Sequence, residues 1–477
     1  MKKVSGRIEL CIVVLLLALL VRANAEVQVL EVRPMDVTAL HVGEGEEHGS
    51  WDGGWRSLDD YFTWKVNVLE ADDYEVAIVY SSVSPFGSEY EITAGDSKVT
   101  GTVRETACWD PRMRITCFER FHHNGTLHLP KGVSTIRVSA TKKPETGEVM
   151  SLWSLELTHP GAKEIVAAAK ERARRLRAST DWFVEAKYGV GFHWTARSQP
   201  RRGPQKPFCE AVKDFDVNAF AKMVEKTGAG YVIFTSTHAP HIFPAPIQAI
   251  ENILPGNTCE RDLIGDIADV LYERGIKLIL YYPGGRRDEF GVASGWTTEG
   301  VSQETVRDAT LGTEYINNFC NIFTELGQRY GNKVAGYYFD LAPFGVSHHY
   351  ELIYMATKIG NPDRIVSWSS RRISKRTDFQ EYWAGEAGRD LLMPEAMHYE
   401  DLQPHTWTII DDGWVHNEPN TDIPPPRFDT ERLIDYVKLC ITKKIVVSMN
   451  VSIYQDGTVS PATLKQMQAL RKAIRGK

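Results

Sequence analysis

The 477-residue sequence contains no Cys-x-x-Cys pair, no Gly-rich phosphate loop and no long block of basic residues. Without a Cys-x-x-Cys pair a structural zinc site is not expected, and we predict neither a metal nor a cofactor. The formal net charge is −7, and an acidic chain without a basic block is a poor candidate for binding nucleic acid. Hydrophobic residues make up 43% and charged residues 25% of the chain, which is typical of a soluble globular protein.

The first 25 residues have the three parts of a secretory signal peptide. Lys2, Lys3 and Arg7 precede a short apolar run at 12–20, and an A-x-A cleavage sequence occupies 23–25. The apolar run is too short to span a bilayer, so no membrane span is expected in the mature chain. We therefore predict a secreted or periplasmic protein whose net charge after cleavage is −10. The alternative is a buried N-terminal helix.

Six cysteines remain after the leader is removed, and export permits disulfides between them. Two pairs are candidates: Cys108 with Cys117, which would close a hairpin, and Cys209 with Cys259, which would staple two loops. Cys320 and Cys440 lie within helical patterns and are predicted to be buried free thiols.

Residues 26–158 carry short alternating strands, such as F-T-W-K-V-N-V, separated by turn residues. This pattern predicts an all-β sandwich. The stretch 59–158 resembles small carbohydrate-binding sandwich modules. Trp51, Trp55 and Trp109 are then either sugar-stacking residues on loops or ordinary core aromatics.

Residues 159–180 are rich in Ala, Glu and Arg and predict a helical connector. Its Arg cluster indicates a solvated helix face, with an anionic partner as the alternative. From 181 to 477 strand and helix patterns alternate through about eight β/α units, which predicts a (β/α)8 TIM barrel. A doubly wound open sheet is the alternative, but it usually has a Gly-rich loop after its first strand.

Residues 334–341, V-A-G-Y-Y-F-D-L, have the pattern of a fully buried strand that ends on Asp340. A charge after such a run is costly unless it faces a cleft. In a parallel barrel the reacting groups lie at the C-terminal ends of the strands. Asp340 is therefore a candidate nucleophile or base, and the alternative is a helix N-cap or a loop carboxylate satisfied by its neighbours.

Polar and aromatic side chains also end most of the other predicted strands. They are His193, Trp194, His238, Tyr281, Tyr282, Arg371, Glu386, Asp411, Asp412, Trp414 and Asn450. Hydrogen-bonding groups beside aromatic faces are typical of sugar sites. Two carboxylates across such a site are what glycosidic cleavage needs.

From Asp181 onward the chain resembles the α-L-fucosidases of glycoside hydrolase family 29. The segment W-F-V-E-A-K-Y-G-V-G-F-H-W at 182–194 is similar to the family's opening strand, and G-A-G-Y-V-I-F-T-S-T-H at 228–238 to its second strand. The tripeptide Y-F-D at 338–340 stands where the family has its nucleophile, and V-S-M-N-V at 447–451 is similar to its closing segment.

The resemblance implies a retaining exo-glycosidase that removes terminal α-L-fucose from oligosaccharides or polysaccharides through a covalent intermediate on Asp340. The sugar-binding residues that it implies are His193, Trp194, His238, Tyr281, Arg371 and Trp414.

The acid/base carboxylate is not at one fixed place in this family. Asp378-Phe, followed by Glu386, resembles one common placement, so we predict Glu386 as the acid/base. Glu381, Glu395 and Glu400 are the alternatives.

Two features depart from the family pattern. Ala239 stands where the second strand normally ends in a second His, and the family's Glu-Trp-Tyr segment is missing between Trp194 and Asp216. Two other functions therefore remain open: a catalytically silent sugar-binding protein, and a barrel glycosidase that acts on another sugar, for instance galactose or a sulfated sugar.

Overall fold

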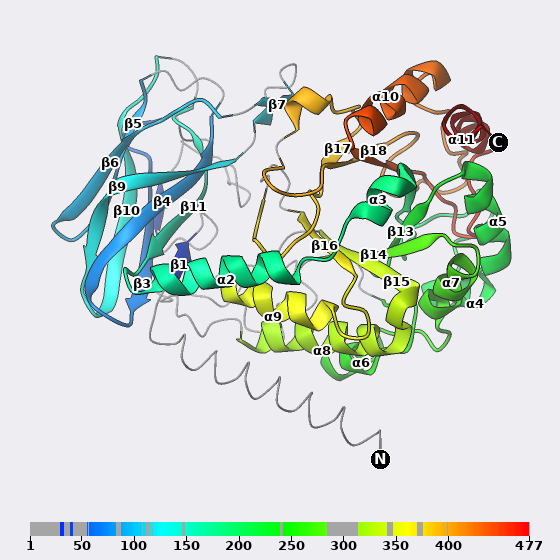
Figure 1. Ribbon diagram of the computed structural model, residues 1–477, viewed down its shortest axis with the longest axis horizontal. Helices are drawn as coiled ribbons and strands as arrows, with labels where there is room; N and C mark the ends of the chain where they lie inside the picture. The colour runs from blue at the N-terminus through cyan, green and yellow to red at the C-terminus, as the bar shows by residue number, and fades with distance from the viewer. Residues whose placement is uncertain are drawn as a thin grey trace. The chain divides into compact units, whose positions relative to one another are not determined.

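The computed structural model describes residues 29–32, 39–41, 55, 57–82, 87–106, 108–110, 115–116, 118–145, 148–238, 242–283, 313–340, 347–369, 375–397 and 399–476. The predicted leader, Trp51, Cys117, Ala239 and Arg371 lie outside these residues. The chain forms two compact units (Figure 1). One holds most of the chain up to Ala169 and the other most of the chain from Lys170. No helix in the described part of the chain is long and apolar enough to cross a membrane.

The first unit is built from two antiparallel sheets. One contains, in spatial order, β1 (Val29–Val32), β11 (Ser151–Thr158), β4 (Asp72–Ser81) and β9 (Glu119–Leu129). The other contains β2 (Ala39–His41), β3 (Tyr61–Val68), β10 (Gly132–Lys142), β5 (Glu89–Ala94) and β6 (Ser97–Thr102). Two short strands, β7 (Cys108–Asp110) and β8 (Ile115–Thr116), pair separately.

Strict alternation along β3 produces the core of this sandwich, because successive side chains of a strand point to opposite faces. Phe62, Trp64, Val66 and Val68 are all buried. Trp55 is also fully buried, with its ring 5.3 Å from that of Phe62. Trp55 is therefore a core aromatic and is not available to stack on a sugar.

The second unit is a parallel barrel whose eight strands are hydrogen-bonded in one continuous order. That order is β16 (Ile365–Ser369), β15 (Val334–Asp340), β14 (Lys277–Pro283), β13 (Tyr231–Thr235), β12 (Tyr188–Phe192), β19 (Val446–Asn450), β18 (His405–Ile409) and β17 (Glu386–Gly388). The predicted (β/α)8 class is confirmed, and the doubly wound alternative is wrong.

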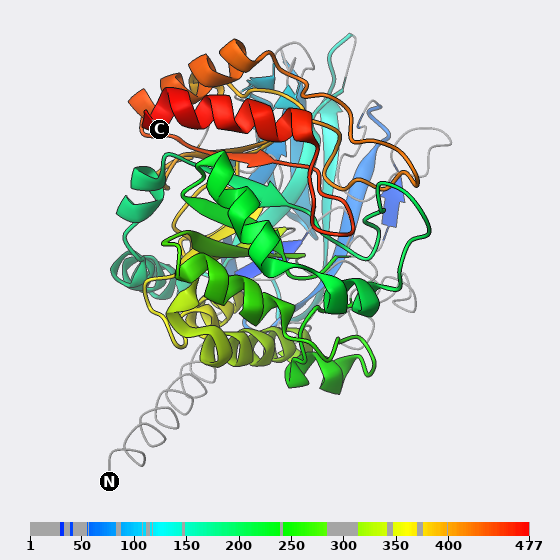
Figure 2. The same cartoon turned by 90° about the vertical axis from the view of Figure 1, so that its right-hand side faces the viewer.

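Helices lie outside the strands of this unit (Figure 1). They are the part of α2 (Ala162–Leu176) from Lys170 onward, and α3 (Asp181–Ala186), α4 (Phe208–Asp214), α5 (Val217–Thr227), α6 (Gln248–Ile253), α7 (Leu263–Tyr272), α8 (Thr313–Tyr330), α9 (Ser347–Thr357), α10 (Thr430–Thr442) and α11 (Pro461–Arg475), with short 3-10 turns at Gly331–Lys333 and Pro394–Ala396. The C-terminal α11, red in Figure 2, packs against α5 and α10.

Local signals fix where the helices begin and end. The Asp216 carboxylate accepts the backbone N–H groups of Asn218 and Ala219 at 3.0 and 2.9 Å, which caps the start of α5. Gly228 ends α5 in the left-handed conformation, which glycine adopts without steric cost.

The barrel is closed between β16 and β17 by an irregular segment. The backbone N–H of Glu381 donates to Val366 O at 2.9 Å, and the Gln403 N–H donates to Glu381 O at 3.0 Å. The predicted strand near Tyr382 is thus a single bridge between Tyr382 and Gln403.

Large rings fill the barrel, and two glycines on β12 make room for them. Phe183 of α3 covers the N-terminal end, with ring centroids 4.8 Å from Tyr231 and 5.0 Å from Tyr382. A Cβ atom on Gly189 would lie 2.3 Å from the Tyr231 ring, and one on Gly191 would lie 2.6 Å from the Trp407 ring. The G-V-G sequence of β12 is therefore required by the rings that pack against it.

The candidate disulfide between Cys209 of α4 and Cys259 is formed, and the other candidate includes Cys117, which lies outside the described residues. Cys440 is buried as predicted, whereas Cys320 on α8 is partly exposed. In the Arg cluster of α2, Arg174 and Arg175 are exposed, as expected for a solvated face, whereas Arg172 is paired with another helix. Arg172 donates from Nε and Nη2 to both carboxylate oxygens of Glu351 on α9, at 2.9 and 2.8 Å. This two-bond geometry makes Arg172 an anchor between helices and not part of a solvated face.

Candidate active site

Asp340 is the last residue of β15 and the only one of that strand that is not fully buried. The hydroxyl group of Tyr281, on the neighbouring strand β14, donates to Asp340 Oδ2 at 2.6 Å. A hydrogen bond to a carboxylate is strong and directional. The phenol of Tyr281 therefore fixes the orientation of the Asp340 side chain at the C-terminal end of the barrel.

A second carboxylate, Glu386, begins β17 on the same side of the barrel. Tyr338 donates its hydroxyl hydrogen to Glu386 Oε1 at 2.7 Å, and Ser369, the last residue of β16, donates to the same oxygen at 3.1 Å. Tyr338 precedes Asp340 by two residues, so the two side chains leave β15 on one face.

Tyr338 is influenced by both carboxylates. Burial raises the pKa of Tyr338 well above its ordinary value, and the negative charges of Glu386 and Asp340 raise it further. The phenol therefore stays protonated and remains a donor. The ring of Tyr281, whose hydroxyl group bonds to Asp340, stacks on that of Tyr338 at 5.9 Å, so two stacked phenols connect Asp340 with Glu386, although 46 residues separate the carboxylates in the sequence.

His193 lies beside this pair, in a group of aromatic rings. Its ring centroid is 4.7 Å from Tyr281, 5.1 Å from Trp407 and 4.9 Å from Trp414. Burial lowers the pKa of His193 to about 3, and a hydrogen bond from the ring to Asn450 opposes this shift only in part. His193 is therefore neutral at ordinary pH. His238, whose ring is 6.4 Å from that of His193 and stacks on Tyr281 at 6.1 Å, completes the group.

One of the predicted site residues, Trp194, is not part of this cluster. The Trp194 side chain is buried against Phe208 and Phe215, with both ring distances at 5.0 Å, and its indole N–H donates to Gln455 O at 3.1 Å. Consecutive residues of an extended segment point to opposite sides, so Trp194 packs outside the barrel when His193 points inside. Arg371 lies outside the described residues.

Other strand-end residues have structural roles. The buried Asp411 carboxylate accepts the Ser452 N–H at 3.1 Å and the Thr463 hydroxyl at 3.0 Å, which fixes the loop after β19. Tyr282 packs against Phe319 and Phe323 of α8, on the outer side of its strand.

The sequence interpretation missed three residues of the site: Tyr338, Ser369 and Trp407. The ring of Trp407 lies 4.7 Å from that of Tyr338 and 5.1 Å from that of Trp414. Tyr338 could have been found from its position two residues before Asp340. Nothing in the local sequence marks Ser369 or Trp407, because their roles depend on which strands become neighbours.

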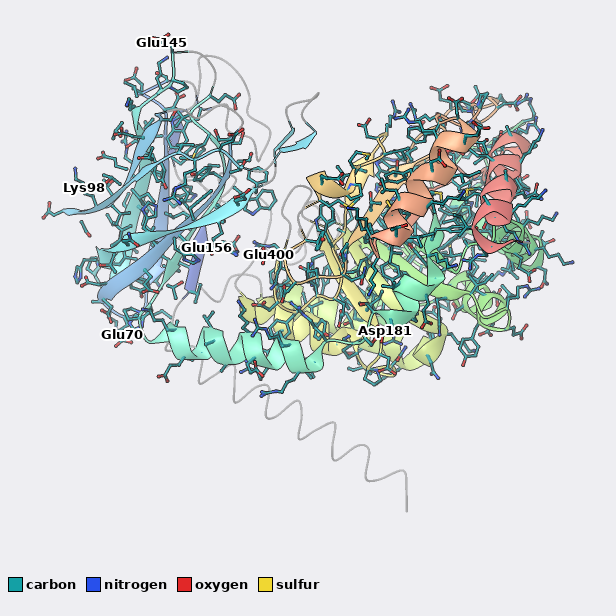
Figure 3. All side chains as sticks on the ribbon, turned by 45° about the horizontal axis from the view of Figure 1, so that its top comes forward. Glu70, Lys98, Glu145, Glu156, Asp181 and Glu400 are labelled. Carbon is teal, nitrogen blue, oxygen red and sulfur yellow. A yellow bond between two sulfur atoms is a disulfide. The ribbon has the colours of Figure 1, made fainter. Side chains whose placement is uncertain are left out.

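The alternative carboxylates lie elsewhere. Glu381 is buried and accepts the N–H groups of Val366 and Ala178 and the Lys358 ammonium group, at 2.7, 2.9 and 2.7 Å. Glu395 is a surface residue whose side chain is 69% exposed. Glu400, labelled in Figure 3, has a side chain that is 53% exposed and lies 3.9 Å from Lys375. Of the four candidates, Glu386 is the one that accepts a hydrogen bond from a residue of the Asp340 strand, Tyr338.

We expect Glu381→Gln to lower stability and to leave the turnover of folded molecules unchanged. Burial lowers the pKa of Lys358, and the Glu381 carboxylate opposes that shift. Removing one partner of a buried ion pair costs roughly 3–5 kcal/mol. Urea unfolding measures the loss of stability. Glu386→Gln is the matched control, which should keep the stability of the wild-type protein and lose turnover. A stable but inactive Glu381→Gln protein would contradict this assignment.

Comparisons with known proteins place the chain in a family. The family model described as Alpha-L-fucosidase matches residues 205–472, which is more than half of the chain. No curated protein matches the chain. Among solved structures, the alpha-L-fucosidase AlfC from Lactobacillus casei, in complex with its alpha-L-fucose product, is 17% identical. The match covers 61% of this chain and 96% of that one, with a TM-score of 0.42.

A bacterial fucosidase with a monovalent iminocyclitol inhibitor is 15% identical over 62% of this chain and 73% of its own, with a TM-score of 0.43. The family match contains Asp340, Glu386 and the strands that carry them, and begins after His193. Because the family model covers more than half of the sequence, the chain belongs to the alpha-L-fucosidase family and is a glycoside hydrolase.

Proposed function

We propose that the protein is an exported, retaining exo-α-L-fucosidase in which Asp340 is the nucleophile and Glu386 the acid/base. The observation that supports this most is the pair of stacked phenols, Tyr281 and Tyr338, which donate to Asp340 and to Glu386 respectively. Two carboxyl groups joined through neighbouring side chains fit a retaining pair, whose members lie roughly 5 Å apart. The signal-peptide pattern of the first 25 residues supports export.

In the first step Asp340 attacks the anomeric carbon of a terminal fucose and forms a glycosyl ester. The bond from that carbon to the leaving oxygen breaks, and Glu386 gives its proton to the oxygen. Tyr281 donates to Asp340 Oδ2, so Oδ1 is the oxygen that attacks. Two hydroxyl groups donate to Glu386 Oε1, so the transferable proton belongs on Oε2.

In the second step Glu386, now a carboxylate, takes a proton from water. The water oxygen attacks the anomeric carbon, the ester bond to Asp340 breaks, and fucose leaves with its original anomeric configuration. The phenol of Tyr281 bonds to Asp340 in both steps, and the bond strengthens as the departing carboxylate regains its charge.

The aromatic side chains supply the sugar-binding surface. Trp414 is partly exposed and its ring lies 4.9 Å from that of His193, whereas Trp407, 5.1 Å from Trp414, is fully buried and supports the Trp414 ring from the core. Aromatic faces cover the apolar side of a sugar, while a neutral imidazole bonds to a hydroxyl group. This combination suits a terminal monosaccharide with one apolar edge, as the methyl group of fucose provides.

Hydrolysis of an aryl α-L-fucoside tests the proposed function, with aryl galactosides as comparison substrates. We expect release of the aryl group from the fucoside, and proton NMR should detect the α anomer of fucose before the β anomer. Appearance of the β anomer first would contradict the retaining mechanism. Turnover of a galactoside alone would contradict the sugar, and binding of fucose without any turnover would favour a sugar-binding protein.

A further inference from the structure

Asn450 is buried at the end of β19 and joins the two parts of the sugar site. Its amide nitrogen Nδ2 lies 2.8 Å from Gly413 O and 3.1 Å from Trp414 O. Its amide oxygen Oδ1 lies 2.8 Å from Nδ1 of His193. One side chain therefore contacts both the loop that carries Trp414 and the imidazole beside the catalytic pair.

These three contacts determine which atoms carry hydrogen. Backbone carbonyl groups can only accept, so the NH2 group of Asn450 must face Gly413 and Trp414. The amide oxygen must then face His193, and because that oxygen can only accept, the hydrogen of the imidazole must be on Nδ1. A neutral imidazole has one N–H group, so Nε2 of His193 carries a lone pair.

Nε2 is the ring atom left for a ligand. Within the described part of the chain no group forms a hydrogen bond with Nε2, and the ring is bordered by Tyr281, Trp407, Trp414 and His238. Of these neighbours, Trp414 and His238 are partly exposed and belong to the proposed sugar-binding surface. A lone pair that faces a sugar accepts a hydrogen bond from a hydroxyl group and offers nothing to a group that can only accept.

We propose that Asn450 is a positioning residue that fixes His193 as a hydrogen-bond acceptor, so that the site selects a sugar hydroxyl that donates. The inference rests on the proposed function for the identity of the sugar. It extends that function by stating that His193 accepts a hydrogen bond from the sugar and that Asn450 determines this direction. A site built to accept from a hydroxyl rejects an analogue without that donor, because the buried acceptor is left unpaired.

The tautomer can be measured without any substrate. We would label the 14 histidines with ¹⁵N, record long-range proton–nitrogen spectra between pH 6 and 8, and assign His193 by its loss in His193→Gln. We expect a protonated Nδ1 and an unprotonated Nε2 in the wild-type protein. A proton on Nε2, in either the other tautomer or the imidazolium form, would overturn the inference. In Asn450→Ala we expect the Nδ1–H tautomer to lose its dominance.

Binding measurements then test the selection. L-Fucose and its mono-deoxy and mono-deoxyfluoro forms would be titrated into the wild-type protein by calorimetry. At one ring position we expect the deoxy and the fluoro compounds to bind equally poorly, roughly 10- to 100-fold more weakly than fucose, because fluorine cannot donate. In Asn450→Ala the loss of affinity caused by modification at that position should disappear, while the losses of affinity (penalties) at the other positions stay.

Asn361→Ala is the matched control. Like Asn450, Asn361 donates from Nδ2 to a backbone carbonyl group. Its acceptor, Val334 O at 3.2 Å, lies at the end of β15 away from Asp340. We expect this variant to keep the wild-type pattern of penalties. Penalties that fall at every position in Asn450→Ala would indicate a general loss of structure and would overturn the proposed selection. Failure of fucose to bind the wild-type protein would count against the proposed function alone, because the NMR measurement decides the tautomer separately.

Discussion

Asp340→Asn should keep the fold and reduce turnover of an aryl α-L-fucoside by roughly 10⁵-fold or more. The amide has nearly the shape of the carboxylate, and its oxygen can still accept the Tyr281 hydroxyl that now bonds to Oδ2. Asp340 is also the least buried residue of its strand, so the loss of charge does not disturb the core. An amide oxygen does not form a glycosyl ester, so the first chemical step is lost.

Asp411→Asn is the matched control for Asp340→Asn, because Asp411 is another carboxylate at the C-terminal end of a barrel strand. It bonds to Ser452 and Thr463 and is buried. We expect this control to lose stability and to retain turnover when folded. A 2-deoxy-2-fluoro fucosyl fluoride should leave a covalent sugar on the peptide that contains Asp340. Near-normal turnover of Asp340→Asn, or a label on another peptide, would place the nucleophile elsewhere.

The sequence alone predicted the barrel and the position of Asp340 for one physical reason. A strand buried on both faces is a continuous apolar run, so a charge at its end marks the point where the strand leaves the core. The V-A-G-Y-Y-F-D run shows this directly, because six of its residues are buried and Asp340 is not. Glu386 follows no such run: it is one of many polar residues at predicted strand ends, and only the resemblance to a family selects it as the acid/base.

Other parts of the site depend on contacts between distant segments. Trp194 shows that a residue next to a site residue can face the opposite way, because the alternation of an extended chain decides the side. Trp407 fits only because Gly191 on β12 has no side chain, and the two are 216 residues apart. The closing segment at Glu381 is irregular, so its hydrogen bonds leave no periodic signal in the sequence.

Arg172 shows that a charge pattern in the sequence likewise does not reveal contacts between distant segments. The Arg-rich helix has the composition of a solvated face, but the bond from Arg172 to Glu351 joins residues 179 positions apart. A charge pattern indicates which residues are able to pair. It does not indicate whether the partner is water or another helix, because that depends on the tertiary packing.

Glu386→Ala should slow the cleavage of fucosylated oligosaccharides by roughly 10²- to 10⁴-fold. A sugar hydroxyl is a poor leaving group and needs a proton, whereas a dinitrophenolate leaves without one. The first step on a dinitrophenyl fucoside should therefore be much less affected. The second step still lacks its base, so the glycosyl-enzyme on Asp340 should accumulate and give a burst followed by slow turnover.

Added azide should restore the turnover of Glu386→Ala on the activated substrate, because the small anion enters the space of the lost carboxylate and attacks without a base. The product should be a fucosyl azide of retained configuration.

Ser369→Ala offers a milder test, because it removes one of the two hydroxyl groups that bond to Glu386 Oε1 and leaves Tyr338 in place. Losing a donor to the carboxylate disfavours its charged form, so the alkaline limb of the pH–rate profile, where the general acid loses its proton, should move to higher pH, without rescue by azide.

The alternative carboxylates complete the comparison. Glu395→Ala and Glu400→Ala remove exposed side chains and should behave as the wild-type protein does. Rescue of either variant by azide, without rescue of Glu386→Ala, would move the acid/base and keep the two-carboxylate mechanism. If no carboxylate variant responds to the leaving group or to azide, a retaining pair does not operate in this barrel. The aromatic cluster around His193 would then be better explained as a site that binds sugar and does not cleave it.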